Sequence, residues 1–392
     1  MPSKGKIQPG LLGRINEWRV LRTIQRNGSL SRAELARATS ITAPTASKAV
    51  EALLRDGWLI EEDDADVRRG RPAKKLRVPS KGAQVLGVVI DQPQCRLVTA
   101  GLDGVLRDET RFTTPESYEA LLHTALTWAQ ERRAQPKMRT YGLCVAMPGL
   151  IDYTEQRGLL SPNVHITDGH TPALDLQKAL GVPCVLIHEI HSLSLAERHR
   201  GSAQGLDDFA LMDLSTGVGF TAVLRGQPFT GHRGLAGELG HITVNSGPEA
   251  RLCGCGNRGC LETEVSDLSL QTAMGAASLD EAIARYNAGE TEVIQAHLDY
   301  LAIGIAAAIH VFNPPHLFLN SRFLQECPAL LPALQSQLAI RTLKPALDDC
   351  TIRLAQGNKS EGVIAGIIEH LTNALLPTSL QELHLLDPAL AP

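Results

Sequence analysis

From Val85 onward, one order of sequence patterns occurs twice: an apolar strand, a hairpin, and later a helix. Alternating strand and helix patterns predict an α/β body. Because one unit is repeated, we predict two similar lobes with a cleft between them, and hairpin tips that face the cleft, where a tip could hold a phosphate. The first copy comprises Val85–Ile90, Cys95–Thr99, Val105–Phe112 (across a turn at Leu102–Gly104) and Ser117–Arg133; the second comprises Phe209–Leu214, Phe220–Leu224, Gln227–Phe229 and Leu301–Phe312, with a further strand at His316–Leu319.

Residues 1–80 follow the pattern of a small helical domain. Ser31 and Glu34 have the spacing of a capping box, which predicts a short helix over Arg32–Ala38. A turn and a second helix over Ala43–Asp56 complete a predicted helix-turn-helix, in which the second helix reads DNA. Small hydroxyl side chains and one cation suit contacts with phosphates and base edges. The outward residues of this helix that have those properties are Thr45, Ser47 and Lys48.

The segment after the second helix has the pattern of a wing, with strands at Gly57–Glu61 and Leu76–Val78. A slim Gly-Arg-Pro tip flanked by arginine could place guanidinium groups in a narrow A·T-rich minor groove, although a solvated charged loop has the same composition. The tip residues expected to contact DNA are Arg68, Arg69 and Arg71. The acidic run Glu61–Asp64 is interpreted as a solvated face that limits non-specific binding.

The formal net charge of −4 is unevenly distributed along the chain. Residues 1–80 hold 16 basic and 9 acidic residues, a net charge of +7, whereas the rest hold 22 and 33, a net charge of −11. A basic head favours contact with double-stranded DNA. The apolar runs fall short of the roughly 18–20 residues of a membrane span, and the N-terminus lacks a secretory signal. We therefore expect a cytoplasmic protein without membrane insertion, whose eight cysteines are thiols or metal ligands.

Three cysteines, Cys253, Cys255 and Cys260, lie close together among glycines. Zn²⁺ prefers such sulfur-rich ligand sets, and His241 is the natural fourth ligand. Four protein ligands close the coordination shell, so we predict a structural zinc ion. Glu238 and Glu262, which adjoin these ligands, would be placed to hold vicinal hydroxyls of a polyol. The remaining cysteines are scattered, mostly in apolar runs, and are predicted to be core residues: Cys95, Cys144, Cys184, Cys327 and Cys350.

In Gly237–His241 and Cys253–Glu262 the sequence resembles the ROK family (repressors, open reading frames and sugar kinases), whose signature these segments match throughout. The basic head is similar to the winged helix-turn-helix of the family's repressor branch. The resemblance implies a winged helix-turn-helix over residues 1–80 and a two-lobed, actin/hexokinase-like (ribonuclease H-like) α/β body over residues 81–392, with a zinc loop at about 237–262. It implies zinc ligands at His241, Cys253, Cys255 and Cys260, and a sugar or sugar-phosphate effector held by Asn163, Glu189, Glu238, His241 and Glu262.

Two departures from the family's kinases argue against catalysis. The kinases carry a glycine-rich phosphate turn after the first strand, but here Asp91–Gln94 contains a proline and no glycine, so its backbone offers too few N–H groups. The kinase Asn-Asp pair, whose aspartate is the base, is replaced by His188-Glu189, and a base misplaced by about 1 Å can cost ~10²-fold in rate. The second phosphate turn, Ser215–Gly219, is largely retained. We expect no enzyme activity, with Glu189 in the position of the kinase base.

These features predict a DNA-binding transcriptional regulator, a repressor of carbohydrate-related genes, whose degenerate cleft binds a sugar or sugar-phosphate effector. The alternative is an ATP-dependent ROK sugar kinase with a regulatory DNA-binding head. The resemblance implies a homodimer, with a tetramer as the alternative. This agrees with the rule that helix-turn-helix proteins usually read two half-sites of an operator. The sequence leaves open the effector, the operator, and whether the protein represses or activates.

Overall fold

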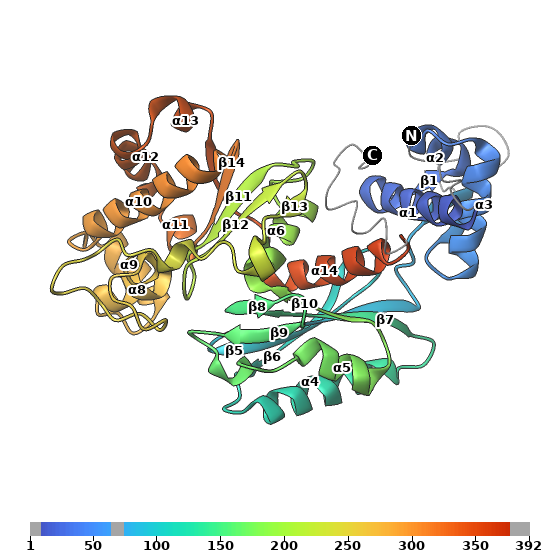
Figure 1. Ribbon diagram of the computed structural model, residues 1–392, viewed down its shortest axis with the longest axis horizontal. Coiled ribbons are helices and arrows are strands. Elements are labelled where there is room, and N and C mark those ends of the chain that lie inside the picture. Colours follow the sequence, from blue (N-terminus) through green and yellow to red (C-terminus); the bar gives the residue numbers. More distant parts are fainter. Residues whose placement is uncertain (1–8, 64–73, 377–392) are drawn as a thin grey trace, which may run out of the picture.

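The computed structural model describes residues 9–63 and 74–376 of the chain. Figure 1 shows a small N-terminal head and a larger body made of two α/β lobes. The elements of the head are α1 (Pro9–Asn27), β1 (Leu30–Ser31), α2 (Arg32–Thr39), α3 (Ala43–Arg55), β2 (Ile60–Asp63) and β3 (Lys74–Arg77). The three strands form one sheet in the order β1-β3-β2, so the head contains the predicted helix-turn-helix followed by two antiparallel wing strands.

The head folds because its short helices have defined ends and one shared core. At the start of α2 the Ser31 hydroxyl accepts a hydrogen bond from the Glu34 N–H, and the Glu34 carboxylate accepts one from the Ser31 N–H, as the capping box predicted. The helix ends at Ser40, which has a left-handed φ of 54°. The shared core joins all three helices to the wing through Val20, Leu21, Ile24, Leu35, Val50, Leu53 and Leu76.

The first lobe is built on a five-stranded sheet in the order β10-β7-β4-β5-β6. β5 pairs with β4 and with β6 in antiparallel orientation, whereas β7 pairs with β4 and with β10 in parallel orientation. The elements of this lobe are β4 (Ala83–Val89), β5 (Gln94–Ala100), β6 (Leu106–Thr113), α4 (Tyr118–Arg133), β7 (Arg139–Met147), the hairpin of β8 (Leu150–Asp152) and β9 (Arg157–Leu160), a 3₁₀ turn (His165–Thr167), α5 (Pro172–Leu180) and β10 (Cys184–His188).

The second lobe repeats this plan, with the order β13-β12-β11-β14-β15. β12 pairs with β11 and with β13 in antiparallel orientation, and β14 pairs with β11 and with β15 in parallel orientation. Both sheets therefore have the same topology. The predicted two-lobed repeat is therefore confirmed. The strands are β11 (Phe209–Asp213), β12 (Gly219–Leu224), β13 (Gln227–Pro228), β14 (His316–Asn320) and β15 (Thr351–Leu354). The helices are α7 (Leu261–Val265), α8 (Asp267–Ala273), α9 (Leu279–Asn287), α10 (Ile294–Phe312), α11 (Arg322–Glu326), α12 (Leu330–Arg341) and α13 (Lys344–Asp348), with 3₁₀ turns at His232–Gly234 and Leu239–His241.

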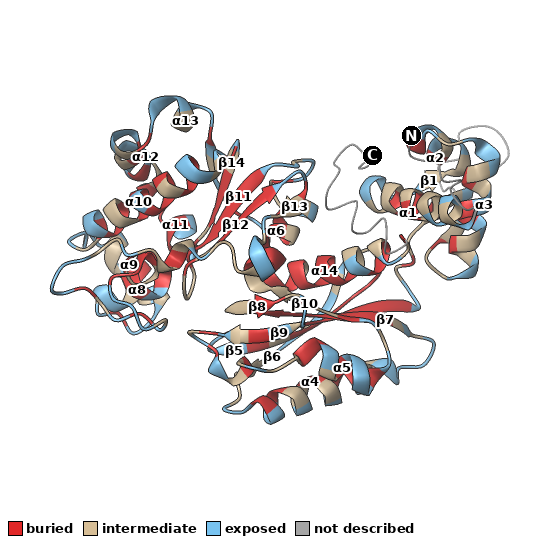
Figure 2. Cartoon of the chain, in the orientation of Figure 1, coloured by how far each residue is buried: buried red, intermediate tan, exposed pale blue. Residues whose placement is uncertain are grey.

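Two helices, α6 (Glu189–His199) and α14 (Lys359–Asn373), lie between the two sheets and contact each other (Figure 1). Apolar residues of α14 pack on the face of the first sheet that α4 and α5 leave open. Ile190 and Leu193 of α6 pack on the second sheet against Phe209, Leu211 and Val223. Figure 2 shows the central strands of both sheets and much of these two helices as buried. The α6–α14 pair therefore joins the two lobes.

Among the described residues, the head contacts the body through α1 and through the end of α3. The indole N–H of Trp18 in α1 donates to Asn373 at the end of α14 (3.1 Å), and the Gln25 amide donates to the Thr372 hydroxyl (3.0 Å). At the end of α3, the Tyr141 hydroxyl donates to the Gly57 carbonyl (2.9 Å). The first wing strand therefore starts at Ile60 and not at the predicted Gly57, because residues 57 and 58 contact the body.

Helix α10 is longer than the predicted segment, since it begins at Ile294 and has 19 residues. In length and composition it could cross a membrane, which holds for no other helix in the described part of the chain. More than half of its apolar window is buried, and its inner face packs in the core of the second lobe. The five cysteines predicted to be core residues are all buried.

Candidate functional site

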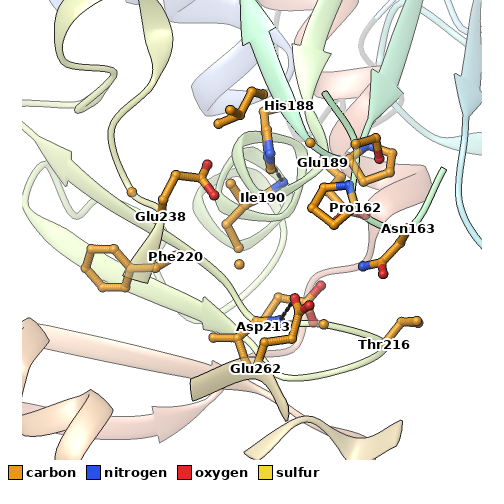
Figure 3. A pocket seen from close by; sticks show the side chains of 18 of the residues that line it. Pro162, Asn163, His188, Glu189, Ile190, Asp213, Thr216, Phe220, Glu238 and Glu262 are labelled. Atoms are coloured by element: carbon orange, nitrogen blue, oxygen red, sulfur yellow. Dashed lines mark hydrogen bonds between the residues drawn. The ribbon is translucent and has the colours of Figure 1, made fainter. Parts of the chain in front are cut away.

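A cavity of about 200 Å³ lies between the two lobes and is lined by segments of both. The first lobe contributes the turn after β4 and the loop after β9, and the second contributes the turn after β11 and the loop before His241. Figure 3 shows the side chains that reach this cavity, including the carboxylates of Glu189, Glu238 and Glu262. The structure brings all five predicted effector-binding residues to this one cavity: Asn163, Glu189, Glu238, His241 and Glu262.

Two positions of the turn after β4 offer no free backbone N–H group. The Gln92 N–H donates to the Asp91 carboxylate (2.9 Å), and Pro93 has no N–H. The peptide bond between these two residues is cis. A phosphate-binding turn needs several N–H groups that point into one concavity. Gln92 and Pro93 contribute none.

The turn after β11, Ser215–Gly219, is closed by carboxylates. The Ser215 N–H and hydroxyl donate to Asp213, and the Val218 N–H donates to Glu262 (3.0 Å). Glu262 approaches so closely that a Cβ at Gly217 would require its carboxylate to shift. A carboxylate of the cysteine-rich loop thus takes up an N–H group of the turn that a phosphate could otherwise use.

At the start of α6, His188 and Glu189 have separate roles. The ring Nδ1 of His188 accepts a hydrogen bond from the Ile190 N–H (3.1 Å), so the histidine caps the helix as an asparagine would. Glu189 lines the cavity. Burial raises the pKa of Glu189, the ammonium of Lys359 opposes this, and Asp91 and Asp213 add to it, so that the pKa is about 7.

Lys359, the first residue of α14, is a cavity residue that the sequence analysis missed. Its ammonium lies 2.5 Å from Glu189 Oε2 and 2.9 Å from Asp91 Oδ2. The sequence could have indicated this role, because a cation in the first turn of a helix is unfavourable to the helix dipole unless acidic side chains lie beside it. Asn358, the residue before it, caps the helix by accepting from the Glu361 N–H.

The four predicted metal ligands form one cluster, in which all the ligand atoms lie within 4.8 Å of one another. Cys253 Sγ is 3.6 Å from His241 Nδ1, and Cys255 Sγ is 3.7 Å from Cys260 Sγ. Ligands at about 2.0–2.3 Å from a tetrahedral zinc ion are separated by roughly 3.5–3.8 Å. The donor set and its spacing therefore fit a four-coordinate metal ion.

The loop that carries these ligands is tight. It places the His241 ring with one edge toward the cysteine ligands and the other toward the cavity. The Cys253 N–H donates to the Asn257 carbonyl (2.8 Å), and Gly259 adopts a φ of 67° where a Cβ would collide with the Asn245 carbonyl. While Nδ1 of His241 faces Cys253, its Nε2 lies 3.7 Å from Glu238 Oε2. One ring nitrogen is thus available to the metal and the other to the cavity.

The predicted DNA-reading residues lie on one helix of the head. In α3, Val50 and Leu53 are buried, Lys48 is exposed, and Thr45 and Ser47 are half-buried. The Thr45 hydroxyl lies 2.8 Å from that of Thr42 at the start of the helix. The predicted wing-tip contacts, Arg68, Arg69 and Arg71, lie outside the described residues.

One sequence interpretation needs correction, and another gains detail. In the acidic run, Glu62 and Asp63 are exposed, as a solvated face requires, and Asp64 lies outside the described residues. Glu61 pairs with Arg32 of α2 (2.8 Å) and with Lys74 of β3 (3.6 Å), and Glu62 pairs with Arg77 of β3. The turn at Leu102–Gly104 does not face the cavity; Asp103 contacts Arg200 instead, and the turn after β4 is the one at the cavity.

Comparison with known proteins covers both parts of the chain. A family model described as ROK family matches residues 86–368, and one described as MarR family matches residues 10–70. The xylose repressor of Bacillus subtilis (strain 168) is 26% identical over 377 residues, which cover 92% of this chain and 97% of that protein. The DNA-binding transcriptional dual regulator NagC of Escherichia coli (strain K12) is 28% identical over 369 residues, which cover 88% of this chain and 90% of that protein.

Solved structures share the fold. A ROK family transcriptional regulator described as a homolog of the E. coli MLC protein has a TM-score of 0.80 at 24% identity, and the match covers 95% of this chain and 99% of that one. A ROK family glucokinase from Streptomyces griseus, in complex with glucose and AMPPNP, has a TM-score of 0.60 at 19% identity, and the match covers 72% of this chain and 97% of that one. The predicted fold is thereby confirmed: a winged helix-turn-helix head and an actin/hexokinase-like body.

Proposed function

The chain belongs to the ROK family, and from this premise we propose that it is a cytoplasmic DNA-binding transcriptional regulator that represses carbohydrate-related genes and responds to a sugar bound between its lobes. The head binds operator DNA, and the body senses the effector. Relatives that align over nearly the whole chain are named as a xylose repressor and as the regulator NagC, which supports this assignment for head and body together.

The observation that carries the proposal is the course of α14. Its first residue, Lys359, lies in the cavity, and its last turn contacts α1 of the head through Thr372 and Asn373. A helix of 15 residues is about 22 Å long. A change at the cavity that moves this helix is delivered to the DNA-binding head, which is the physical connection that an effector-controlled regulator requires.

For DNA, we propose that α3 enters the major groove with Thr45, Ser47 and Lys48, and that Arg68, Arg69 and Arg71 of the wing reach the minor groove. Small hydroxyl side chains permit close approach of the helix to the bases, and Lys48 is exposed. A homodimer would present two such heads to the two half-sites of an operator.

For the effector, we propose that Asn163, Glu189, Glu238, His241 and Glu262 hold the hydroxyl groups of a sugar. Carboxylates and amides accept and donate hydrogen bonds in directions that fixed hydroxyl groups can match. Glu262 is already held by the Val218 N–H, and His241 by the cysteine-rich loop, so these side chains are preorganised before the sugar enters.

We further propose that His241, Cys253, Cys255 and Cys260 bind a structural zinc ion. The bound ion supplies rigidity and no reaction step, because four protein ligands leave no open coordination position. The ligand residues contact both cavity glutamates, since His241 Nε2 lies 3.7 Å from Glu238 Oε2 and Cys253 Sγ lies 3.7 Å from Glu262 Oε1. Zinc content measured on the purified protein, and its loss in Cys260→Ser, tests this assignment.

A sugar kinase is the second candidate function, and the retained turn Ser215–Gly219 favours it. Three features argue against the kinase. Pro93 lacks an N–H, and N–H groups of both turns are already bonded to carboxylates. The ammonium of Lys359 lies beside Glu189, which has the position of the kinase base. Sugar-dependent formation of ADP that is abolished by Glu189→Gln would establish the kinase.

The proposed function is tested by selecting duplexes from a random library with the full chain, and by measuring affinity for the selected duplex over a range of salt concentrations. We expect sequence-selective binding that weakens linearly with the logarithm of the salt concentration. The absence of selective binding would remove the regulatory role, whatever the body binds.

A further inference from the structure

At one end of the cavity, a single ammonium group is enclosed by three carboxylates. Lys359 Nζ lies 2.5 Å from Glu189 Oε2, 2.9 Å from Asp91 Oδ2 and 3.6 Å from Asp213 Oδ2. The lysine side chain is only 7% exposed. An ammonium group has three N–H donors, and here three acidic side chains face them.

The three carboxylates belong to different parts of the fold. Asp91 follows β4 in the first lobe, Asp213 ends β11 in the second, and Glu189 opens α6 between them. Asp213 is also held by the Asn320 amide (2.8 Å), and Asp91 lies 3.5 Å from Arg96. The ammonium therefore bridges both lobes at fixed acidic positions, as a bound cation would.

Acidic residues outnumber lysine and arginine in the lining of the cavity. Lys359 is the only lysine or arginine among the lining residues. The acidic lining residues are Asp91, Glu189, Asp213, Glu238 and Glu262. Burial lowers the pKa of His188 to about 3 and that of His191 to about 4, so neither supplies a positive charge at neutral pH. Burial alone would lower the pKa of Lys359, but Glu189, Asp213 and Asp91 raise it above its ordinary value, so the lysine stays charged.

Beside Lys359, the donors that a phosphate group would need are already bonded. A buried phosphate needs cationic or N–H donors that are free to bond to it. The Lys359 ammonium is directed at carboxylates, the Gln92 N–H is bonded to Asp91, and the Val218 N–H is bonded to Glu262. Pro93 has no N–H. Hydroxyl groups, by contrast, can donate to carboxylates that face the cavity.

We propose that Lys359 is a built-in counter-cation that fills the cleft between the two turns, and that the cavity in consequence takes an uncharged polyol and rejects its phosphate ester. This inference rests on the proposed function, since it names the chemical class of the effector. It assigns to Lys359 a role in specificity.

The first test uses the unmodified full chain and matched pairs of ligands. The probes are D-glucose and its 6-phosphate, N-acetyl-D-glucosamine and its 6-phosphate, and D-xylose, with binding measured by calorimetry and by thermal shift. We expect an unphosphorylated sugar to bind and its ester to bind at least about tenfold more weakly, because like charges brought together in an interface are costly. An ester that binds as tightly as its parent sugar, or more tightly, overturns the inference.

Operator binding measured on the same preparation separates this result from the proposed function. If an ester is preferred while selective DNA binding persists, only the assignment of an uncharged ligand fails. If no probe binds while DNA binding persists, the inference fails together with the sensing role, and the DNA-binding role stands. If selective DNA binding is absent, the proposed function fails on its own evidence.

The second test addresses the counter-cation directly. In Lys359→Met the three carboxylates would face one another without an ammonium, and oxygen ligands in this arrangement suit a hard divalent cation. We expect millimolar Mg²⁺ or Ca²⁺ to raise the Tm of this variant, and to leave the Tm of the unmodified chain and of Lys344→Met unchanged. Lys344 is a matched control because its side chain is 85% exposed and pairs with a single carboxylate, Asp348.

Lys359→Arg retains the charge, and we expect no response of its Tm to the divalent cation. A Lys359→Met variant whose Tm is equally insensitive would contradict the counter-cation role. Should Lys359→Met fail to fold, the ligand pairs on the unmodified chain still decide the inference.

Discussion

The contact between α14 and the head makes a quantitative prediction about Thr372→Val. The Thr372 hydroxyl accepts from the Gln25 amide of α1 (3.0 Å) and donates to the Ile368 carbonyl (2.7 Å). Valine keeps the shape of threonine but removes the acceptor, so the part-buried Gln25 amide loses its partner at Thr372. The loss of one such bond costs about 1–2 kcal/mol.

If α14 links the cavity to the head, the lost hydrogen bond lowers the coupling free energy between effector binding and operator binding by this amount. A change of about 1.4 kcal/mol corresponds to a tenfold change in an equilibrium constant. We therefore expect the factor by which a bound sugar changes operator affinity to shrink by about 5- to 30-fold in Thr372→Val, or to vanish if the factor is smaller. Affinity for the sugar itself should stay within about twofold, because Thr372 lies outside the cavity lining.

The assay is fluorescence anisotropy of a selected operator duplex, with and without the sugar. Thr124→Val is the matched control, since Thr124 also donates to the carbonyl four residues earlier in a helix (2.9 Å) but lies on α4, on the other face of the sheet. If Thr372→Val and Thr124→Val respond to the sugar alike, α14 is not the connection between cavity and head.

Three further predictions concern single residues. In the folded protein the pKa of Glu189 is about 7, whereas its ordinary value is 4.5. The folded protein therefore binds this proton more tightly than the unfolded chain does, and the free energy of unfolding falls as pH rises from about 4.5 to about 7. Over this range, chemical denaturation should show that Glu189→Gln gains stability relative to the unmodified chain by the order of 1–3 kcal/mol, and parallel pH profiles would contradict this. Cys260→Ser should lose bound zinc and at least about 3 kcal/mol of stability, measured by denaturation and metal analysis, whereas Cys350→Ala, outside the cluster, should keep its zinc. Lys48→Ala should weaken operator binding and reduce the slope of log affinity against log salt by about 1 if it contacts a phosphate, and an unchanged slope and affinity would exclude Lys48 from the interface.

The parts of the fold that local chemistry determines were predictable from the sequence. The capping box of Ser31 and Glu34 fixed the start of α2 to the residue, because both hydrogen bonds join groups three positions apart. The repeated order of apolar strands led to two sheets with the same topology. The spacing of Cys253, Cys255 and Cys260 with His241 led to one compact cluster.

The parts that depend on contacts between distant segments were not predictable in this way. Lys359 meets Asp91, which lies 268 positions earlier, only because the lobes fold onto the same helix pair. The pairing of Glu61 with Arg32 was equally hidden in the sequence, because Arg32 precedes it by 29 positions. The residues at Gly57 and Trp58 have the pattern of a strand, yet contact with Tyr141 of the body places them in a turn. In each case a partner remote in sequence decides the structure.

The central claim is that one chain couples a sugar in the cavity to the affinity of its head for DNA. Its most direct test is the dissociation constant of the full chain for a selected operator duplex, measured at fixed salt with and without a saturating unphosphorylated sugar that has been shown to bind. We expect the sugar to change this constant by about 5- to 150-fold, the range of ordinary allosteric coupling. A constant that is the same with and without the bound sugar would contradict it.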